Sequence, residues 1–281
     1  MGFLIYNAMS IKTMPVWKWV LLLLASLFLA INMYGGAQAA LEAVQPYWLK
    51  WIVAIAESVA MLLLYAVFVR WFEKQPAPDL SPQRIVPDTC KGMGYGAAFM
   101  LAVTLVMMLF GFYKIDMVQQ GVALALVTAF LRFLMVAVGE EILFRGVLFR
   151  WIDEKWGFAA ALAVSAVLFG AMHSWQPGAT WWSSLAIAIE AGLLLGAAYK
   201  LAGNLWLPIG IHWAWNFVQG NIFGFEVSGG DAGDSLLKAT VQGPDILTGG
   251  AFGAEASIIT VVLGLALSIW FILRCPKKQR D

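Results

Sequence analysis

The sequence has few charged residues, few cysteines and few histidines, and each shortage excludes a class of protein. Only 12% of the 281 residues are charged and 61% are hydrophobic, whereas soluble domains carry about 25% charged and about 45–50% apolar residues. This composition excludes an ordinary soluble domain and favours a protein that lies in a bilayer. The net charge of +1 gives no electrostatic basis for binding nucleic acid, so we expect no such partner.

The two cysteines, Cys90 and Cys275, do not predict a disulfide. Both fall on the side that we assign to the cytoplasm, where thiols stay reduced. The chain also has no internal repeat and no stretch that reads as a separate soluble domain. We therefore expect a single membrane domain over residues 1–281.

Apolar segments long enough to cross a bilayer recur along the whole chain. They predict an all-α integral membrane bundle of about eight transmembrane helices. The segments are Val16–Met33, Trp48–Val69, Gly94–Phe112, Val122–Gly139, Phe158–Met172, Trp182–Leu201, Leu207–Phe225 and Ser257–Leu273. We expect the fourth to continue as helix as far as Trp156.

Lysine and arginine orient this bundle, because cytoplasmic loops keep the positive charge. With a cytoplasmic N-terminus, only Lys50, Lys114 and Lys238 fall outside, and Arg132 falls within the fourth helix. All other basic residues then face the cytoplasm. We expect a multi-pass protein of the plasma (inner) membrane with both termini cytoplasmic.

The first segment has a second interpretation. Residues 16–33 could be a signal anchor that is cleaved, because Ala37-Gln38-Ala39 resembles a signal-peptidase site. Cleavage would leave seven spans. We favour a retained helix, since the apolar run is long enough to span the bilayer.

Two extramembrane stretches are long. Phe72–Met93 holds four prolines and predicts an extended cytoplasmic linker. Glu226–Ala256 is glycine-rich and acidic, faces outward in this topology, and is either an ordered lid or a floppy loop. Floppy loops are the commoner case.

Three short patterns place polar side chains in apolar helices. An ionisable group in the bilayer costs free energy, so its presence there indicates a function. Glu141 and Arg145 are four residues apart and can pair on one helix face. Glu140 points about 100° away around the helix and escapes that pairing. One carboxylate would therefore be a fixed anion while its neighbour accepts protons.

The other two patterns contain the only histidines of the chain. Phe169 and His173 lie one helical turn apart. His212 and Asn216 are also four residues apart, so both side chains leave an apolar helix on the same face.

Together these residues resemble the three signature motifs of the CAAX-protease and bacteriocin-processing (CPBP) family of intramembrane proteases. The motifs are Glu-Glu-x-x-x-Arg, Phe-x-x-x-His and His-x-x-x-Asn/Asp, and all three occur here in that order. Gly146 also matches the usual Arg-Gly continuation. The resemblance covers Glu140–Asn216, within a motif-bearing core of about residues 122–225.

The resemblance implies an endopeptidase that hydrolyses a membrane-associated peptide or protein, including prenylated CAAX-type substrates, beside the lipid bilayer. Glu140 and His173 would activate a water molecule. His212 and Asn216 would donate hydrogen bonds to the oxyanion.

In the same family picture, Glu141 and Arg145 would fix the helix end. We expect the site to open to the cytoplasm, near Arg150 and Lys155 at the end of the fourth helix.

A metal-dependent mechanism is the alternative. Glu140, His173 and His212 would suffice as ligands for a catalytic zinc with one open position. The HExxH motif is absent, however, and we favour a mechanism without metal or other cofactor.

Two non-protease functions also stay open. Relatives of this type include bacteriocin self-immunity proteins or membrane scaffolds, which bind rather than cut. A small transporter could instead use Glu57, Arg132 and Glu190 as a relay. For these three residues we expect mutual pairing inside the bundle, Arg132 with Glu190 or Glu57.

Overall fold

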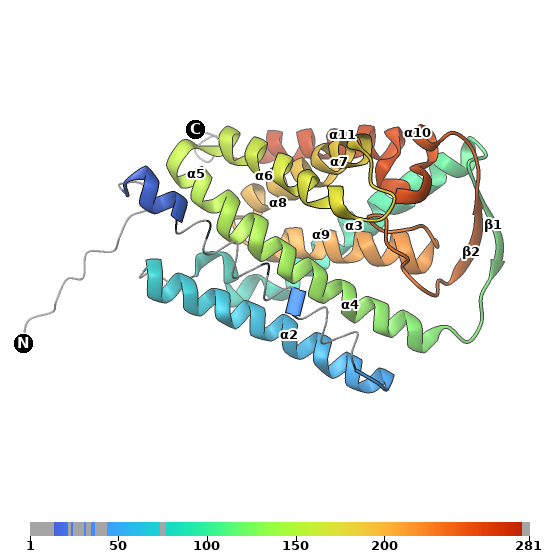
Figure 1. Ribbon diagram of the computed structural model, residues 1–281, viewed down its shortest axis with the longest axis horizontal. Coiled ribbons are helices and arrows are strands. Elements are labelled where there is room, and N and C mark those ends of the chain that lie inside the picture. Colours follow the sequence, from blue (N-terminus) through green and yellow to red (C-terminus); the bar gives the residue numbers. More distant parts are fainter. Residues whose placement is uncertain are drawn as a thin grey trace, which may run out of the picture.

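The computed structural model describes residues 14–21, 24, 31, 35–36, 44–73 and 77–276. Over these ranges the chain forms an elongated bundle of helices with a two-stranded ribbon at one end (Figure 1). The predicted first helix, Val16–Met33, falls largely outside the described residues, and Ala37-Gln38-Ala39 falls wholly outside them.

Seven of the eight predicted segments contain a helix of the bundle. These helices are α2 (Tyr47–Phe68), α3 (Ile85–Leu109), α4 (Ala123–Glu141), α6 (Phe158–Met172), α7 (Trp181–Ile187) with α8 (Leu193–Ala202), α9 (Trp206–Phe217) and α11 (Ile258–Arg274). The bounds of α6 are those predicted from the sequence.

Five helical stretches among the described residues are long and apolar enough to cross a membrane. They are Tyr47–Trp71, Pro82–Leu109, Ala123–Trp156, Phe158–Trp175 and Trp181–Ala202, and Ile258–Arg274 is apolar but shorter. The chain is therefore an all-α membrane bundle in its main architecture, but the predicted count of about eight spans is not confirmed.

The predicted span at Leu207–Phe225 shows why the count differs. It forms α9 and the π-helical η8 (Val218–Ile222), and nearly every side chain of α9 is buried among its neighbours. A helix that is apolar on all sides can be buried in protein as well as in lipid, and the sequence does not distinguish the two.

The predicted proline-rich linker at Phe72–Met93 is wrong in its second half. Two single 3₁₀ turns, η3 (Pro78–Leu80) and η4 (Pro82–Arg84), lead directly into α3 at Ile85. Pro87 is accommodated because it lies in the first turn of α3, where its missing N–H needs no helical acceptor.

The fourth helix continues as predicted. After α4 the chain forms a π-helical segment, η5 (Ile142–Phe149), and then α5 (Arg150–Trp156). All eight residues of η5 are buried. The helix stops at Gly157, whose φ of 84° favours glycine.

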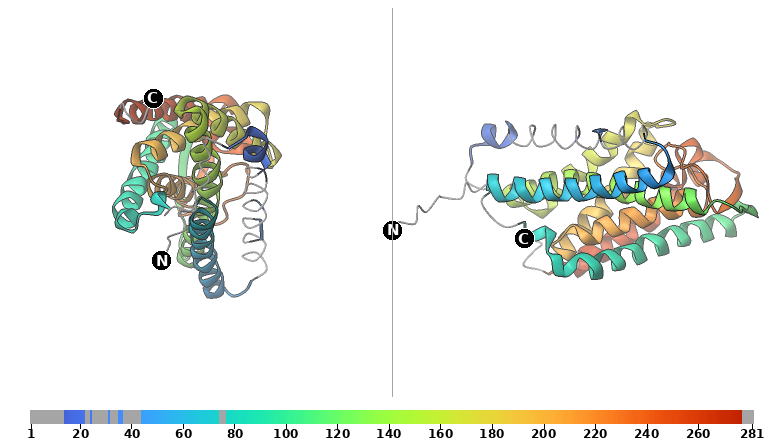
Figure 2. Two further views of the ribbon diagram at one scale, coloured as in Figure 1. Left: turned by 90° about the vertical axis from the view of Figure 1, so that its left-hand side faces the viewer. Right: turned by 90° about the horizontal axis from the view of Figure 1, so that it is seen from below.

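Helix α9 is held against α3 by direct backbone contact, and the two run side by side in Figure 2. A Cβ atom added at Gly96 would lie 2.3 Å from the Ile211 carbonyl oxygen, and one at Gly210 would lie 2.3 Å from the Thr89 carbonyl oxygen. Only glycine fits such an approach, so these positions fix where α9 presents its side chains.

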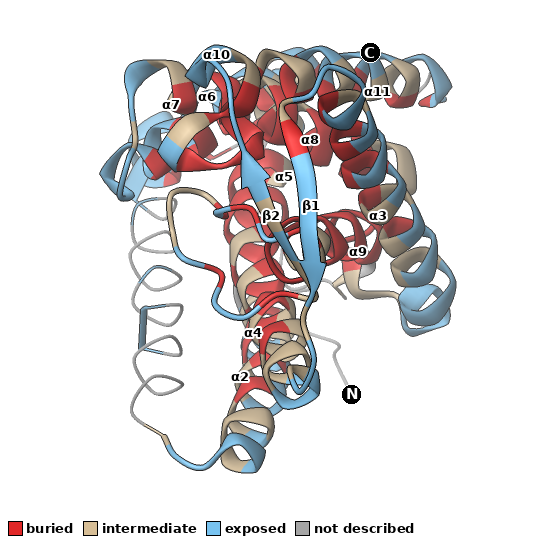
Figure 3. Ribbon diagram, turned by 90° about the vertical axis from the view of Figure 1, so that its right-hand side faces the viewer, coloured by how far each residue is buried: buried red, intermediate tan, exposed pale blue. Residues whose placement is uncertain are grey.

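The stretch Glu226–Ala256 is ordered, so the floppy-loop interpretation is wrong. Its strand β2 (Leu237–Val241) pairs antiparallel with β1 (Tyr113–Val118) across the end of the bundle, and the short helix α10 (Asp245–Thr248) follows (Figure 3). Gly229 N donates to Phe252 O at 2.8 Å, and Gln219 Nε2 donates to Glu226 O at 2.7 Å. These bonds fasten the stretch over the helices.

Candidate active site

The six predicted site residues come from three helices that meet in the middle of the bundle. Glu140 and Glu141 end α4, and Arg145 lies in η5. His173 begins the 3₁₀ turn η6 (His173–Trp175) after α6, and His212 and Asn216 lie on α9. The structure brings all of these elements into one region.

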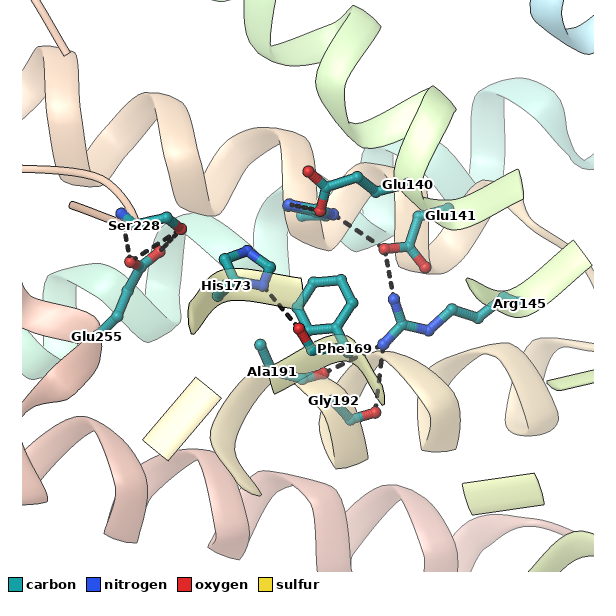
Figure 4. A network of polar contacts seen from close by, with 10 residues as sticks. Glu140, Glu141, Arg145, Phe169, His173, Ala191, Gly192, Ser228 and Glu255 are labelled. Atoms are coloured by element: carbon teal, nitrogen blue, oxygen red, sulfur yellow. Dashed lines mark hydrogen bonds and ion pairs between the residues drawn. The ribbon is translucent and has the colours of Figure 1, made fainter. Parts of the chain in front are cut away.

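The predicted pair of Glu141 and Arg145 forms in the closed interior. Arg145 Nη1 lies 2.9 Å from Glu141 Oε1, and both side chains are 0% exposed. Arg145 Nη2 also donates to Gly192 O at 3.2 Å in the π-helical η7 (Ala188–Gly192), as Figure 4 shows. The guanidinium lies 4.7 Å from the Phe169 ring centroid. Arg145 thus links η5, η7 and α6.

The same carboxylate orients one histidine. His212 Nδ1 lies 2.9 Å from Glu141 Oε1, and because a carboxylate only accepts, Nδ1–H is the donor. The other ring nitrogen, Nε2, lies 3.8 Å from Glu140 Oε2. Arg145, Glu141 and His212 therefore form a buried polar network, and Glu140 contacts its outer end through His212 Nε2.

The second histidine is oriented by backbone. His173 Nδ1 donates to the Phe169 carbonyl oxygen at 2.7 Å (Figure 4). In the neutral ring this leaves Nε2 as an acceptor. The Phe169 ring also lies 4.8 Å from the His173 ring and 6.1 Å from the His212 ring, between centroids. The motif phenylalanine therefore packs between the two histidines and the buried arginine.

A cavity of about 530 Å³ lies on the Glu140 side of this arrangement. Four of the predicted residues line it: Glu140, His173, His212 and Asn216. Further lining comes from α4, from the start of α2, from the turn that follows η6 and from the stretch Glu226–Ala256. These residues are Lys50, Thr128, Arg132, Phe133, Val136, Gln176, Val227, Ser228, Gly230 and Asp231.

The direction of the cavity corrects one prediction. We expected an opening near Arg150 and Lys155, but the lining residues on α4 run the other way, from Glu140 back to Thr128. The reason is the buried η5, which fills the space between Glu140 and Arg150.

A small chamber of about 10 Å³ adjoins the site, and it contains a residue that sequence reasoning missed. His173, His212, Asn216, Ser228 and Glu255 line it. Glu255 is 3% exposed, and burial raises the pKa of its carboxyl to about 7 although Ser228 N donates to it at 2.6 Å. Its sequence signal was weak: an acidic residue two positions before an apolar segment, without a motif.

The comparison with known families agrees with this geometry. Residues 121–218 match the family model of Rce1-like type II CAAX prenyl endopeptidases. The chain is therefore similar to this family over its motif-bearing core. No curated protein and no solved structure matches the chain.

The match to the Rce1-like family model suggests an intramembrane CAAX-type endopeptidase, which is a hydrolase. The matched range contains all six predicted site residues. It ends before the cover at Glu226–Ala256 and excludes Glu255.

The zinc alternative names Glu140, His173 and His212 as ligands. Over the part of the chain that the structure describes, no group of three His, Cys, Asp or Glu side chains is arranged to hold a metal ion. Each histidine donates Nδ1–H within the fold and keeps Nε2, and His212 Nε2 lies 3.8 Å from Glu140 Oε2. Metal-ligating histidines commonly donate their other ring N–H in this way.

The predicted pairing of Arg132 with Glu190 or Glu57 is wrong. Glu190 is 0% exposed on η7, packed against Gly264 of α11, and neither carboxyl oxygen makes a hydrogen bond. Arg132 lines the cavity on the opposite side of the site. A transporter relay would need these three residues to form one network. Within the described chain they do not form one.

Proposed function

We propose that this protein is an intramembrane endopeptidase in which Glu140 and His173 activate water and His212 and Asn216 stabilise the oxyanion. One observation carries the proposal. These four side chains line one cavity, while Glu141 and Arg145 lie closed behind it at 0% exposure.

We assign water activation to Glu140 and His173 because each presents an acceptor atom to the cavity. Glu140 is 17% exposed and faces the cavity, where a carboxylate can accept a proton. His173 presents Nε2, because Nδ1–H is donated to Phe169 O. A water molecule between the two acceptors would be held by both and would pass one proton to Glu140.

The oxyanion donors lie on α9. Asn216 carries two amide hydrogens and is 6% exposed. His212 can donate from Nε2 only in its doubly protonated form, since Nδ1–H is donated to Glu141.

The chemical step then balances without further reactants. The water oxygen forms a bond to the carbonyl carbon, its proton goes to Glu140, and the carbonyl electron pair moves onto the oxyanion. When the tetrahedral intermediate collapses, the C–N bond breaks and Glu140 returns its proton to the leaving amine. The products are a carboxylic acid and an amine.

The substrate is a peptide that reaches the site from the membrane or its surface. The apolar helices keep the site within the bundle, and the family model concerns prenylated C-terminal CAAX sequences. We therefore propose a lipidated peptide as the substrate class.

The test is cleavage of a fluorogenic lipidated CAAX peptide by the detergent-purified protein. We expect activity in the wild type, with and without EDTA or phenanthroline, and loss of activity in Glu140→Ala. Activity that chelators abolish would assign the chemistry to a metal. Wild-type protein that binds a broad set of membrane peptides but cuts none would favour the immunity or scaffold alternative.

A further inference from the structure

We propose that Arg132 binds the free C-terminal carboxylate of the substrate at the end of the cavity away from Glu140. Lys50 would supply a second positive charge at the same end of the cavity. This inference rests on the proposed function and assigns a substrate feature to the same cavity.

Arg132 is a cation within the apolar helix α4, and no described residue is its counterion. Its side chain is partly buried and lines the cavity. Among the described residues it forms no ion pair, and its guanidinium lies 5.0 Å from the Phe133 ring centroid. A charge at membrane depth costs about 2.5–3.5 kcal/mol on insertion scales, so an arginine without a partner indicates a charged ligand.

A second cation lies at the same end of the cavity. Trp51 Nε1 donates to Thr128 Oγ1 at 2.8 Å, which joins the start of α2 to α4 one turn before Arg132. Lys50 precedes Trp51, lines the cavity and likewise has no ion pair in the described part of the chain. Two cations on facing helices form a site for an anion.

The spacing along α4 suits a peptide of defined length. Arg132 and Glu140 are eight residues apart, which is about 12 Å along an α-helix. Three extended residues span about 10 Å. A peptide held with its scissile carbonyl at Glu140 would therefore bring the carboxylate of the third residue beyond it to the Arg132 guanidinium.

The bidentate geometry of arginine matches a carboxylate. The one acidic side chain on this part of the wall is Asp231, and its Oδ1 already accepts from Gly233 N at 2.7 Å. Asp231 is exposed at the rim, whereas Arg132 is partly buried. The charge deeper in the cavity is therefore positive and fits an anionic chain end.

The experiment compares two lipidated peptides that differ only at the C-terminus, one a free acid and one an amide. Each has its cleavage site three residues from the end. We expect the wild type to cleave the acid with a kcat/KM about tenfold or more above that of the amide, the ratio expected for a charged hydrogen bond. Arg132→Gln should cleave both peptides alike, and Arg132→Lys should keep part of the preference.

Lys114→Gln is the matched control, since Lys114 is an exposed cation on β1 at the same end of the molecule. It should keep the preference of the wild type. Equal cleavage of acid and amide by the wild type, or loss of both activities in proportion in Arg132→Gln, would overturn the inference and leave the proposed function standing.

A binding measurement separates the two proposals if no cleavage is seen. Fluorescence anisotropy with Glu140→Gln, which should not cut, gives a Kd for each peptide. Binding of the acid about tenfold tighter than the amide supports the inference, and equal affinities overturn it, whether or not the wild type is a protease.

Discussion

Glu140 and Glu141 are adjacent in sequence, yet they belong to two regions of different character. Glu141 lies in the buried polar network with Arg145 and His212, where its Oε1 atom is 2.9 Å from each partner. Glu140 faces a cavity of about 530 Å³. The buried network has its partners within the fold, whereas Glu140 contacts His212 on one side and faces the cavity on the other.

This difference separates structural from chemical roles. Removing a member of a closed network leaves a buried charge without its partner, which costs stability. Removing a group that faces the cavity leaves the fold intact and costs activity. Variants of either region should therefore change one measured quantity and spare the other.

The largest effect on stability is expected from Arg145→Leu. It leaves Glu141 buried without its cation and should lower the free energy of unfolding by about 3–5 kcal/mol. Thermal unfolding in detergent measures this. The double variant with Glu141→Gln should recover part of the loss, because no buried charge is then uncompensated. A double variant no more stable than Arg145→Leu would contradict the network.

On the cavity side, Asn216→Ala should lower kcat by about 10²–10³-fold, which is the usual effect of removing one oxyanion donor. KM and the melting temperature should change little. If KM rises while kcat is kept, Asn216 binds the substrate rather than the transition state.

The packing of α9 against α3 can be tested with two glycines of α3. Gly96→Ala should destabilise the protein by about 1–3 kcal/mol, since the new Cβ would lie 2.3 Å from Ile211 O. Gly94→Ala is the control, because a Cβ there meets nothing within 4 Å. Equal melting temperatures for the two variants would show that α3 and α9 do not pack as described.

The smallest effect is expected from Glu255→Gln, at the boundary of the two regions. Because burial holds its pKa near 7 in the folded chain, above the ordinary 4.5, the folded state favours the protonated carboxyl. The contribution of Glu255 to stability should be greatest below about pH 4.5 and should fall as the pH rises through about 7. His212 is the charged neighbour that acts on Glu255 and lowers its pKa, and Glu255 in turn acts on Glu190.

Glu255→Gln should flatten this pH dependence when melting temperatures are compared from pH 4.5 to 8. Glu154→Gln, at an exposed position on α5, should leave it unchanged. A Glu255→Gln profile identical to that of the wild type would show that the slope arises elsewhere.

Local pattern was enough to predict the helices and the elements that carry the site. The bounds of α6, the continuation of α4 to Trp156 and the Glu141–Arg145 pair follow from apolar run length and i, i+4 spacing. The contact of α9 with α3 also had a signal, Gly92-x-x-x-Gly96 in an apolar segment, but that pattern does not name its partner helix.

Features that depend on packing between distant segments were not predicted. The direction of the cavity is set by the buried η5, whose residues look like an ordinary apolar helix in sequence. Glu190 was given a partner because buried charges usually have one, but η7 places it against Gly264 instead. The order of Glu226–Ala256 comes from pairing with β1, more than a hundred residues away in the chain.

A comparison of Glu140→Gln with Glu141→Gln tests the division between the buried network and the cavity most directly. Each protein would be assayed for cleavage of the lipidated peptide and for thermal unfolding. We predict that Glu140→Gln loses about 10²–10⁴-fold in kcat with an unchanged melting temperature, whereas Glu141→Gln unfolds at a clearly lower temperature. Full activity in Glu140→Gln, or the same loss of stability in both variants, would contradict the division between the buried network and the cavity.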